Sequence, residues 1–94
     1  MKKNNLRIDD EIYFIYGETS INKLTVKFLG NSSFVHNYAF DPQFKENFRR
    51  PIEYKDEGIT WFRTFEQAKQ KLYEKHESSG HIKQYDTDYW EIKL

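Results

Sequence analysis

The stretch best suited to contacting a partner lies between residues 44 and 50. Two aromatic rings, Phe44 and Phe48, alternate there with three cations, Lys45, Arg49 and Arg50. Rings that stack on bases, together with cations that neutralise phosphates, hold single-stranded nucleic acid. Arginine also forms bidentate forks on carboxylates, so a protein partner fits equally well. We predict a partner-binding segment at these five residues; the structural alternative is that the rings cap the core and the arginines are solvated.

Trp61 extends this prediction because the chain is rich in aromatic side chains. Eight Phe, seven Tyr and two Trp make up 18% of the residues. Each ring buries a large area, so a small core needs few of them and some must stay partly exposed. Exposed apolar surface of this kind marks interaction sites. We therefore predict that Trp61 and the aromatic residues near the C-terminus join the contact surface.

A second candidate surface is basic. Lys23 and Lys27 lie on the polar side of an alternating segment, so both should point outward, with Arg63 nearby. A row of cations on a sheet face could meet the phosphates of nucleic acid. Such a row is more commonly a solvated face that discourages aggregation. A nucleic-acid face at Lys23, Lys27 and Arg63 is therefore the alternative prediction.

Metal chemistry has little support in the positions of the three histidines, His36, His76 and His81. A zinc site needs three or four converging ligands, commonly including a pair two residues apart on a strand or four apart on a helix. No two of these histidines have that spacing. We predict no metal site and no cofactor.

Four residues near the C-terminus are the remaining catalytic candidates. Asp86, Asp88, Glu91 and Lys93 resemble the D…E-x-K set of metal-dependent nucleases, in which two carboxylates hold Mg²⁺. The spacing is too compressed, however, since Glu91 and Lys93 alternate as on any exposed strand face. The chain also lacks a Ser-His-Asp arrangement and a phosphate-binding Gly loop. We therefore predict no catalytic residue and a non-enzymatic protein.

Length and composition set further bounds. The 94 residues predict a single domain, 1–94, in which the polar residues 1–7 are flexible. Fifteen basic and 15 acidic residues balance, so the net charge favours no polyanionic partner. The chain has no cysteine, which excludes disulfides and thiolate metal sites. Without a signal-peptide-like or membrane-spanning stretch, we expect a cytoplasmic location and no membrane contact.

Strands should position the first two-fifths of the chain. Residues 12–16 form a continuous apolar and aromatic run that ends at Gly17, which indicates a buried strand. Two alternating segments follow, separated by turn-forming residues, and predict an antiparallel meander. The residues expected to face inward are Leu24, Val26 and Phe28 in the second strand and Phe34, His36, Tyr38 and Phe40 in the third.

One helix is predicted in the second half. Phe44 and Phe48 are four residues apart, which indicates only a single helical turn. Residues 59–63 then predict a fourth strand. Thr64 has Gln67 three positions later, the spacing of a capping box. A helix should therefore run from about residue 65 to residue 77.

The last segment, residues 89–94, alternates again, with Trp90, Ile92 and Leu94 expected to face inward. We predict it to be an edge strand or the strand that closes a barrel, and a homodimer through it stays open. The expected fold is α+β and mainly β. It is a small antiparallel curled sheet or SH3-like barrel of four to five strands, with one helix before the last strand.

Residues 10–15 (DEIYFI) and 58–72 (GITWFRTFEQAKQKL) carry a family resemblance. The pattern resembles short proteins of prophages and other mobile elements of low-GC bacteria, which open with a similar strand and end with a Thr-capped E-x-A-x-x-x-L helix. The resemblance covers about a third of the chain. It implies a small barrel-plus-helix fold and a phage-like origin.

Together these observations predict a non-enzymatic protein-interaction module. The resemblance implies an accessory protein that docks on and inhibits a host protein such as a defence nuclease, of the anti-CRISPR or anti-restriction type. The first alternative is a nucleic-acid-binding SH3-like barrel. The second is a metal-dependent nuclease-like enzyme.

Overall fold

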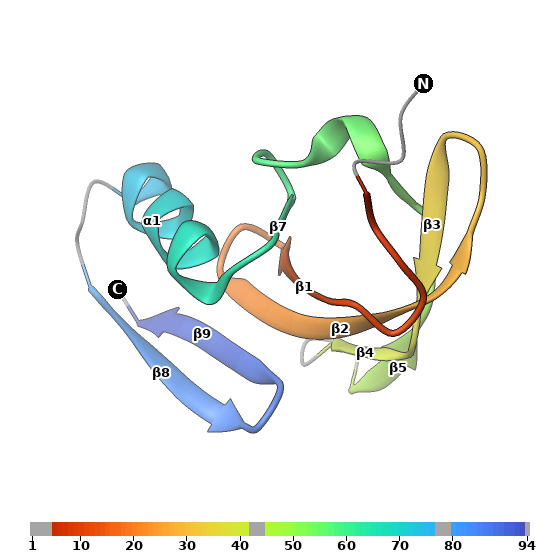
Figure 1. Cartoon of the computed structure of the whole chain (residues 1–94). Helices are drawn as coiled ribbons and strands as arrows, with labels where there is room; N and C mark the ends of the chain where they lie inside the picture. The colour runs from red at the N-terminus through yellow and green to blue at the C-terminus, as the bar shows by residue number, and fades with distance from the viewer. Residues whose placement is uncertain (1–4, 42–44, 77–79, 94) are drawn as a thin grey trace.

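The computed structural model describes residues 5–41, 45–76 and 80–93, which form a curved antiparallel sheet with one α-helix (Figure 1). The helical elements are a 3₁₀ turn, η1 (Tyr54–Asp56), and α1 (Phe65–Lys75). The strands are β1 (Glu11–Tyr16), β2 (Ser20–Leu29), β3 (Ser33–His36), β4 (Ala39–Asp41), β5 (Glu46–Phe48), β6 (Ile52–Glu53), β7 (Trp61–Phe62), β8 (His81–Asp86) and β9 (Tyr89–Lys93).

Strand β2 is the spine of the sheet. The order is β6-β3-β2-β1-β7, and β9 also pairs with β2 and carries β8 on its other side. Because β1 takes one edge of β2, the opposite edge is shared: residues 20–22 pair with β9, and residues 26–29 pair with β3. The sheet curls into a half-barrel, and β4 and β5 form a separate hairpin. The predicted mainly-β α+β fold is confirmed, although with more and shorter strands than expected.

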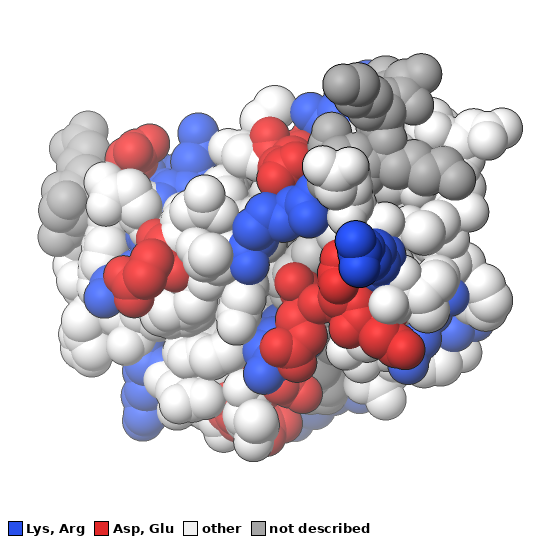
Figure 2. All heavy atoms as spheres, viewed as in Figure 1, with Lys and Arg blue, Asp and Glu red and all other residues white. Residues whose placement is uncertain are grey.

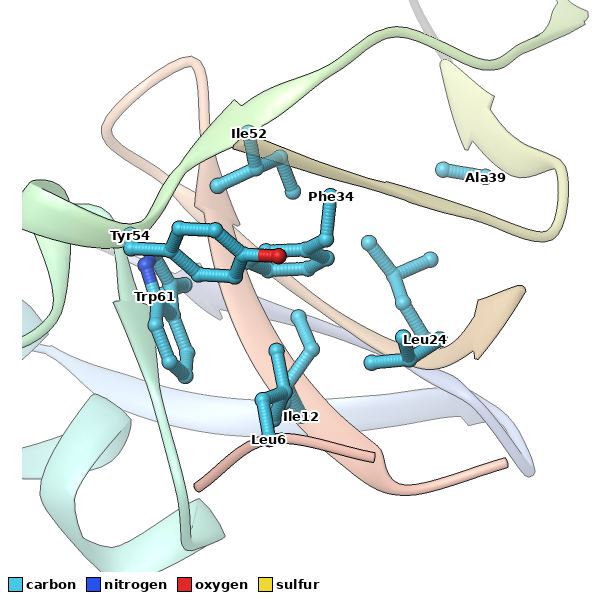
Figure 3. Packing of buried hydrophobic residues seen from close by; sticks show 9 residues of the cluster. Leu6, Ile12, Leu24, Phe34, Ala39, Ile52, Tyr54 and Trp61 are labelled. Carbon is cyan, nitrogen blue, oxygen red and sulfur yellow. The ribbon is translucent and has the colours of Figure 1, made fainter. Parts of the chain in front are cut away.

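The larger core cluster fills the concave side of the half-barrel (Figure 3). The indole of Trp61 is fully buried and makes an edge contact with the ring of Phe34 at 5.1 Å. Its Nε1 donates to the carbonyl oxygen of Glu53 at 3.0 Å, which satisfies its polar atom. The members of this cluster are Leu6, Ile12, Leu24, Val26, Phe34, Ala39, Ile52, Tyr54 and Trp61.

A second core cluster joins α1 to the sheet. Ala68 and Leu72 of the helix are fully buried. They pack with Ile15, Ile21, Phe62 and Ile92 from four different strands. Burial of one apolar stripe holds the helix in place, as the spacing of apolar residues at every third or fourth position predicts.

Helix α1 begins as predicted. The Oγ1 atom of Thr64 accepts a hydrogen bond from the backbone N–H of Gln67, and the side chain of Gln67 accepts one from the backbone N–H of Thr64, both at 3.2 Å. This reciprocal pair is the capping box. At the other end, the ring of His76 is hydrogen-bonded to the carbonyl oxygen of Glu18 at 2.9 Å. The helix ends at Lys75, two residues earlier than expected.

Replacing Thr64 with Ala should lower the free energy of unfolding by about 1 kcal/mol, because the hydroxyl acceptor for the Gln67 N–H is lost. Urea denaturation followed by far-UV circular dichroism measures the change. Thr64→Ser keeps the hydroxyl and should cost much less. Equal losses in the two variants would show that the cap does not stabilise this helix.

The inward prediction for Phe28 was wrong. The pairing of β2 with β3 shifts register between Val26 and Phe28, which marks a β-bulge. An extra residue reverses the alternation of faces beyond it, so Val26 is buried while Phe28 is 59% exposed. The sequence alternation continues through this point, so the bulge cannot be seen in it.

The prediction for Tyr38 was also wrong. Strand β3 ends at His36, and β4 begins at Ala39. The break changes which side chains face inward, so Ala39 is buried and Tyr38 is 63% exposed. The side chain of Phe40 lies outside the described part of the structure.

Two element predictions in the second half need correction. Residues 46–48 form strand β5, which pairs with β4, and not the predicted helical turn. The last strand, β9, is not an edge, because it lies between β2 and β8. The edge beyond β9 is formed by β8, which the sequence did not predict because five of its six residues are exposed and polar or aromatic. Leu94 lies outside the described residues.

Candidate functional site

Arg49 stands over two exposed rings on the surface. Its guanidinium carbon lies 4.9 Å from the ring centroid of Tyr38 and 6.0 Å from that of Phe28. Distances up to about 6 Å allow cation–π attraction. Both rings are more than half exposed, so the face that they share with Arg49 is open to a partner.

Arg50 makes a similar arrangement with two other rings. Its guanidinium carbon lies 5.2 Å from the ring centroid of Phe48 and 5.9 Å from that of Tyr16. These two rings also contact each other, with centroids 4.7 Å apart. We call the two groups together the arginine–aromatic patch; its members are Tyr16, Phe28, Tyr38, Phe48, Arg49 and Arg50.

Three local features of the chain bring the patch together. The β-bulge turns Phe28 outward, and the break between β3 and β4 turns Tyr38 outward. The hairpin pairs Ala39 of β4 with Phe48 of β5. Continuing that register by one position sets Tyr38 opposite Arg49, which explains their contact. The patch is thus assembled from segments that are far apart in the sequence.

The two arginines of the patch keep their charge available. No ion pair involves Arg49 or Arg50 within residues 5–41, 45–76 and 80–93. The aromatic faces restrain the guanidinium groups without neutralising them. A partner that brings carboxylates or phosphates would therefore meet positioned, uncompensated cations.

The predicted basic face is different, because each of its cations lies against a carboxylate. Hydrogen bonding and attraction to Glu11 raise the pKa of Lys23. On the face seen in Figure 2, blue and red atoms lie side by side. The ion pairs are Lys23 with Glu11 at 3.4 Å and with Asp88 at 3.9 Å, Lys27 with Asp9 at 3.7 Å, and Arg63 with Glu57 at 3.0 Å.

A buried histidine packs against one of the rings of the patch, that of Phe48. His36 is fully buried, and its ring lies 6.4 Å from that of Phe14 and 6.3 Å from that of Phe48. Its Nδ1 donates to the carbonyl oxygen of Asn37, and its Nε2 has no hydrogen-bond partner among the described residues. Removal from water lowers the pKa of His36 from 6.5, so the neutral ring is favoured.

This burial predicts a loss of stability in acid. Below about pH 6.5 the unfolded chain takes up a proton that folded His36 resists, so the free energy of unfolding falls as the pH decreases. The loss stops growing below the depressed pKa of the folded state. Urea denaturation at about pH 7.5 and about pH 5 measures it.

The matched comparison is His36→Gln, which has no titrating group at this position. Its loss of stability between the two pH values should be smaller than that of the natural chain. An identical loss in both proteins would show that other groups cause the acid sensitivity. Carboxylates titrate in both proteins, so their contribution cancels in the comparison.

The structure brings together three of the predicted contact residues, Phe48, Arg49 and Arg50, in the patch. Lys45 is exposed in the turn between β4 and β5, and Phe44 lies outside the described residues. Trp61 was predicted as a contact residue, and this was wrong. Its side chain is fully buried in the core and cannot reach a partner in the folded protein.

Tyr16, Phe28 and Tyr38 were missed as contact residues. They lie in segments that were assigned to strands and core, Tyr16 from a continuous apolar run and Phe28 and Tyr38 from alternation. Their only sequence signal was the aromatic content of the whole chain, which requires exposed rings without identifying them.

Two of the four residues that resemble a nuclease set, Glu91 and Lys93, contact each other within the sheet. The hydroxyl of Tyr89 donates to a carboxylate oxygen of Glu91 at 2.6 Å, and Lys93 lies 3.5 Å from the same carboxylate group. Across the described ranges, no three His, Asp or Glu side chains gather into a group that could hold a metal ion. A separate open hollow of ≈ 470 Å³ lies beside α1, with Glu57, Phe62, Glu66 and Lys71 among its walls.

No helix in the described part of the chain combines the length and apolar character needed to cross a membrane. No family model, no curated protein and no solved structure matches this chain.

Proposed function

We propose that this protein is a non-enzymatic interaction module that binds another protein through the arginine–aromatic patch. The observation that carries the proposal is the state of Arg49 and Arg50. Each is held over two aromatic rings, and neither has a carboxylate partner among the described residues.

The chemistry of the patch suits an acidic protein surface. Arg and Tyr are enriched among the residues that dominate protein–protein binding energy. Each exposed cation–π contact contributes about 0.5–1 kcal/mol and also restricts the guanidinium before binding. A partner carboxylate can then form a bidentate pair with less loss of side-chain entropy. Tyr38 and Phe28 add apolar area around the charged groups.

The kind of partner is a further part of the proposal. The resemblance of residues 10–15 and 58–72 to proteins of mobile elements supports a host protein as the target. An accessory protein that docks on and inhibits a host defence nuclease, of the anti-CRISPR or anti-restriction type, fits a small chain with one preorganised contact surface.

Nucleic acid is the second candidate ligand, because stacked arginines and open rings also suit bases and phosphates. Two observations weigh against it. Lys23 and Lys27 are each ion-paired, so they do not extend the patch as a track of free cations. The formal net charge of the chain is +0, which gives no general attraction to a polyanion.

The test is a capture experiment with immobilised protein and a low-GC bacterial lysate, split into nuclease-treated and untreated halves. The natural chain should capture one protein in stoichiometric amount from both halves. Arg49→Glu with Arg50→Glu should reduce that capture at least about tenfold, because two attractive contacts become repulsive. Lys55→Glu with Lys71→Glu makes the same change in net charge away from the patch and should leave capture intact.

Thermal melting of both double variants separates binding from folding. The side chains of Arg49 and Arg50 are exposed, so the double variant should lose stability only through its cation–π contacts and should still unfold in one cooperative transition. Capture that survives the Arg49 and Arg50 changes would overturn the proposal. Capture that disappears after nuclease treatment, and falls steeply with salt, would establish nucleic acid as the ligand instead.

A further inference from the structure

Strand β8 is an open edge of the sheet. Among the described residues it pairs only with β9, and its outer side has no neighbouring strand (Figure 1). Five of its six residues are exposed. An unpaired strand edge presents backbone donors and acceptors that can pair with another chain.

The direction of these backbone groups follows from β9. The N–H of Ile92 donates to the carbonyl oxygen of Thr19, on the β2 side, at 2.9 Å. Ile82 is the residue of β8 opposite Ile92. In an antiparallel ladder, successive residues point their backbone groups to alternate sides. The N–H and C=O of Ile82 therefore point to the free edge, and those of Gln84, two residues on, do the same.

An aromatic hollow lies next to this edge. It has a volume of ≈ 250 Å³ and opens between α1 and the β8–β9 hairpin. Phe65, Lys69 and Tyr73 of the helix form one wall, and Trp90 of β9 forms part of another. Phe65 and Trp90 contact each other, with ring centroids 4.8 Å apart. All three aromatic side chains are half-buried, so each still exposes part of its surface in the hollow.

The edge and the hollow share two residues. Ile82 and Gln84 also line the hollow with their side chains. In a pair of strands, residues directly opposite each other have their side chains on the same face. A strand added to β8 would therefore direct alternate side chains toward the hollow, while its backbone bonds to Ile82 and Gln84. The remaining side chains of that strand would face the other side of the sheet.

Charge on that other face restricts what can bind. Lys83 lies there, with its Nζ 5.0 Å from the ring centroid of Tyr85, and Lys93 lies 5.1 Å from the same ring. Lys83 is in no ion pair with any residue that the structure describes. Lysine on an edge strand discourages indiscriminate pairing. A strand that carries an acidic residue beside Lys83 would turn this barrier into an attraction.

We propose that β8 binds an extended segment of a partner protein as an added strand, one in which apolar and acidic residues alternate. The apolar side chains enter the aromatic hollow, and the acidic ones face Lys83. Main-chain hydrogen bonds would give affinity, and the hollow would give specificity. This site is a second binding surface and does not depend on the arginine–aromatic patch.

A second copy of this chain fits the edge less well. A two-fold axis perpendicular to the sheet keeps each face on its own side, so it must lie midway between one residue of β8 and the same residue of the second copy. Centred on Lys83, it sets that cation against its own copy; centred on Ile82, it sets His81 against Lys83. Centred on Gln84, the pairing would run into the register shift between Gln84 and Asp86, which interrupts the ladder. In every case, like charges, mismatched side chains or an interrupted ladder oppose the pairing.

The probe is a fluorescein-labelled peptide of about seven residues in which Glu and Leu alternate, a common strand length. Its fluorescence anisotropy should rise saturably as the protein is added. Gln84→Pro removes one outward N–H and leaves the β9 side of the ladder intact, so it should weaken binding at least about tenfold. Lys83→Glu should weaken binding by a similar factor, because it repels the acidic side chains.

Two control peptides separate strand addition from simple adhesion. A version that is N-methylated at alternate residues keeps every side chain but cannot complete the ladder, and it should not bind. A version with Lys in place of Glu should bind much more weakly. Equal binding of the methylated peptide, or no saturable binding of the original, would overturn the proposal. Both outcomes are measured on the natural chain, so the test stands even if Gln84→Pro does not fold.

The patch and the edge are tested independently. Arg49→Glu with Arg50→Glu should leave peptide binding unchanged, since these residues do not line the hollow. Loss of peptide binding in that variant would contradict a separate site. Sedimentation velocity checks the other occupant: a dimer that Gln84→Pro converts to a monomer would show that a second copy takes the edge and would overturn the peptide proposal.

Discussion

Trp61→Ala is expected to lower the free energy of unfolding by about 3–5 kcal/mol, the range for removing a large buried ring. The indole is fully buried, packs against Phe34 and donates its N–H to Glu53. Small domains have total stabilities of about 5–15 kcal/mol, so this loss brings the protein close to unfolding at room temperature. Urea denaturation followed by circular dichroism measures it.

Trp61→Phe is the matched control. It keeps an aromatic ring near Phe34, so its loss of stability should be smaller than that of Trp61→Ala. The loss should not be zero, because the carbonyl oxygen of Glu53 no longer has its indole donor. The comparison also decides the role of Trp61. A Trp61→Ala protein with unchanged stability and lost partner capture would show that the residue binds a partner, contrary to its burial.

The second large effect is expected for Leu72→Ala, at about 2–5 kcal/mol. Leu72 is fully buried in the cluster that joins α1 to the sheet. Truncation removes apolar contacts from Ile21 and Phe62 and leaves a cavity that the rigid strands cannot close completely. Thermal and urea unfolding both measure the loss. Gln70→Ala, an exposed change on the same helix, should have almost no effect.

Both core variants should unfold in a single transition. Strand β1 supplies Ile12 to the larger cluster and Ile15 to the smaller one, and β2 likewise supplies Leu24 and Ile21. Neither cluster can lose its packing without disturbing strands that the other needs. A separate early transition in Leu72→Ala, resolved by circular dichroism from the main unfolding transition, would show that the helix detaches independently.

Local chemistry made the helix and the central strands predictable. The Thr64 cap needs only Gln67 three residues later, and a stripe of Ala68 and Leu72 specifies the buried face. Strands β1 and β2 were found because apolar residues dominate one and alternate in the other. These features depend on neighbours in the sequence, which is why one chain sufficed to identify them.

The missed features depend on contacts between distant segments. The bulge at Phe28 depends on the pairing of the second half of β2 with β3. No residue type near Phe28 in the sequence indicates a bulge. Strand β8 is held by its hydrogen bonds to β9, not by burial, so its polar sequence gave no strand signal. The same cause limited the site: Arg49 and Arg50 were identified from their types, but their partners Tyr38 and Phe28 were not.

The alternating direction of the β8 backbone should also be visible in amide hydrogen exchange. The N–H groups of Ile82 and Gln84 point away from β9 and face water, so their hydrogens should exchange with deuterium almost as fast as in an unstructured peptide. The N–H of Lys83 points toward β9 and should exchange more slowly. A fast–slow–fast pattern over three consecutive residues would therefore report, without any ligand, which side of the hairpin is open.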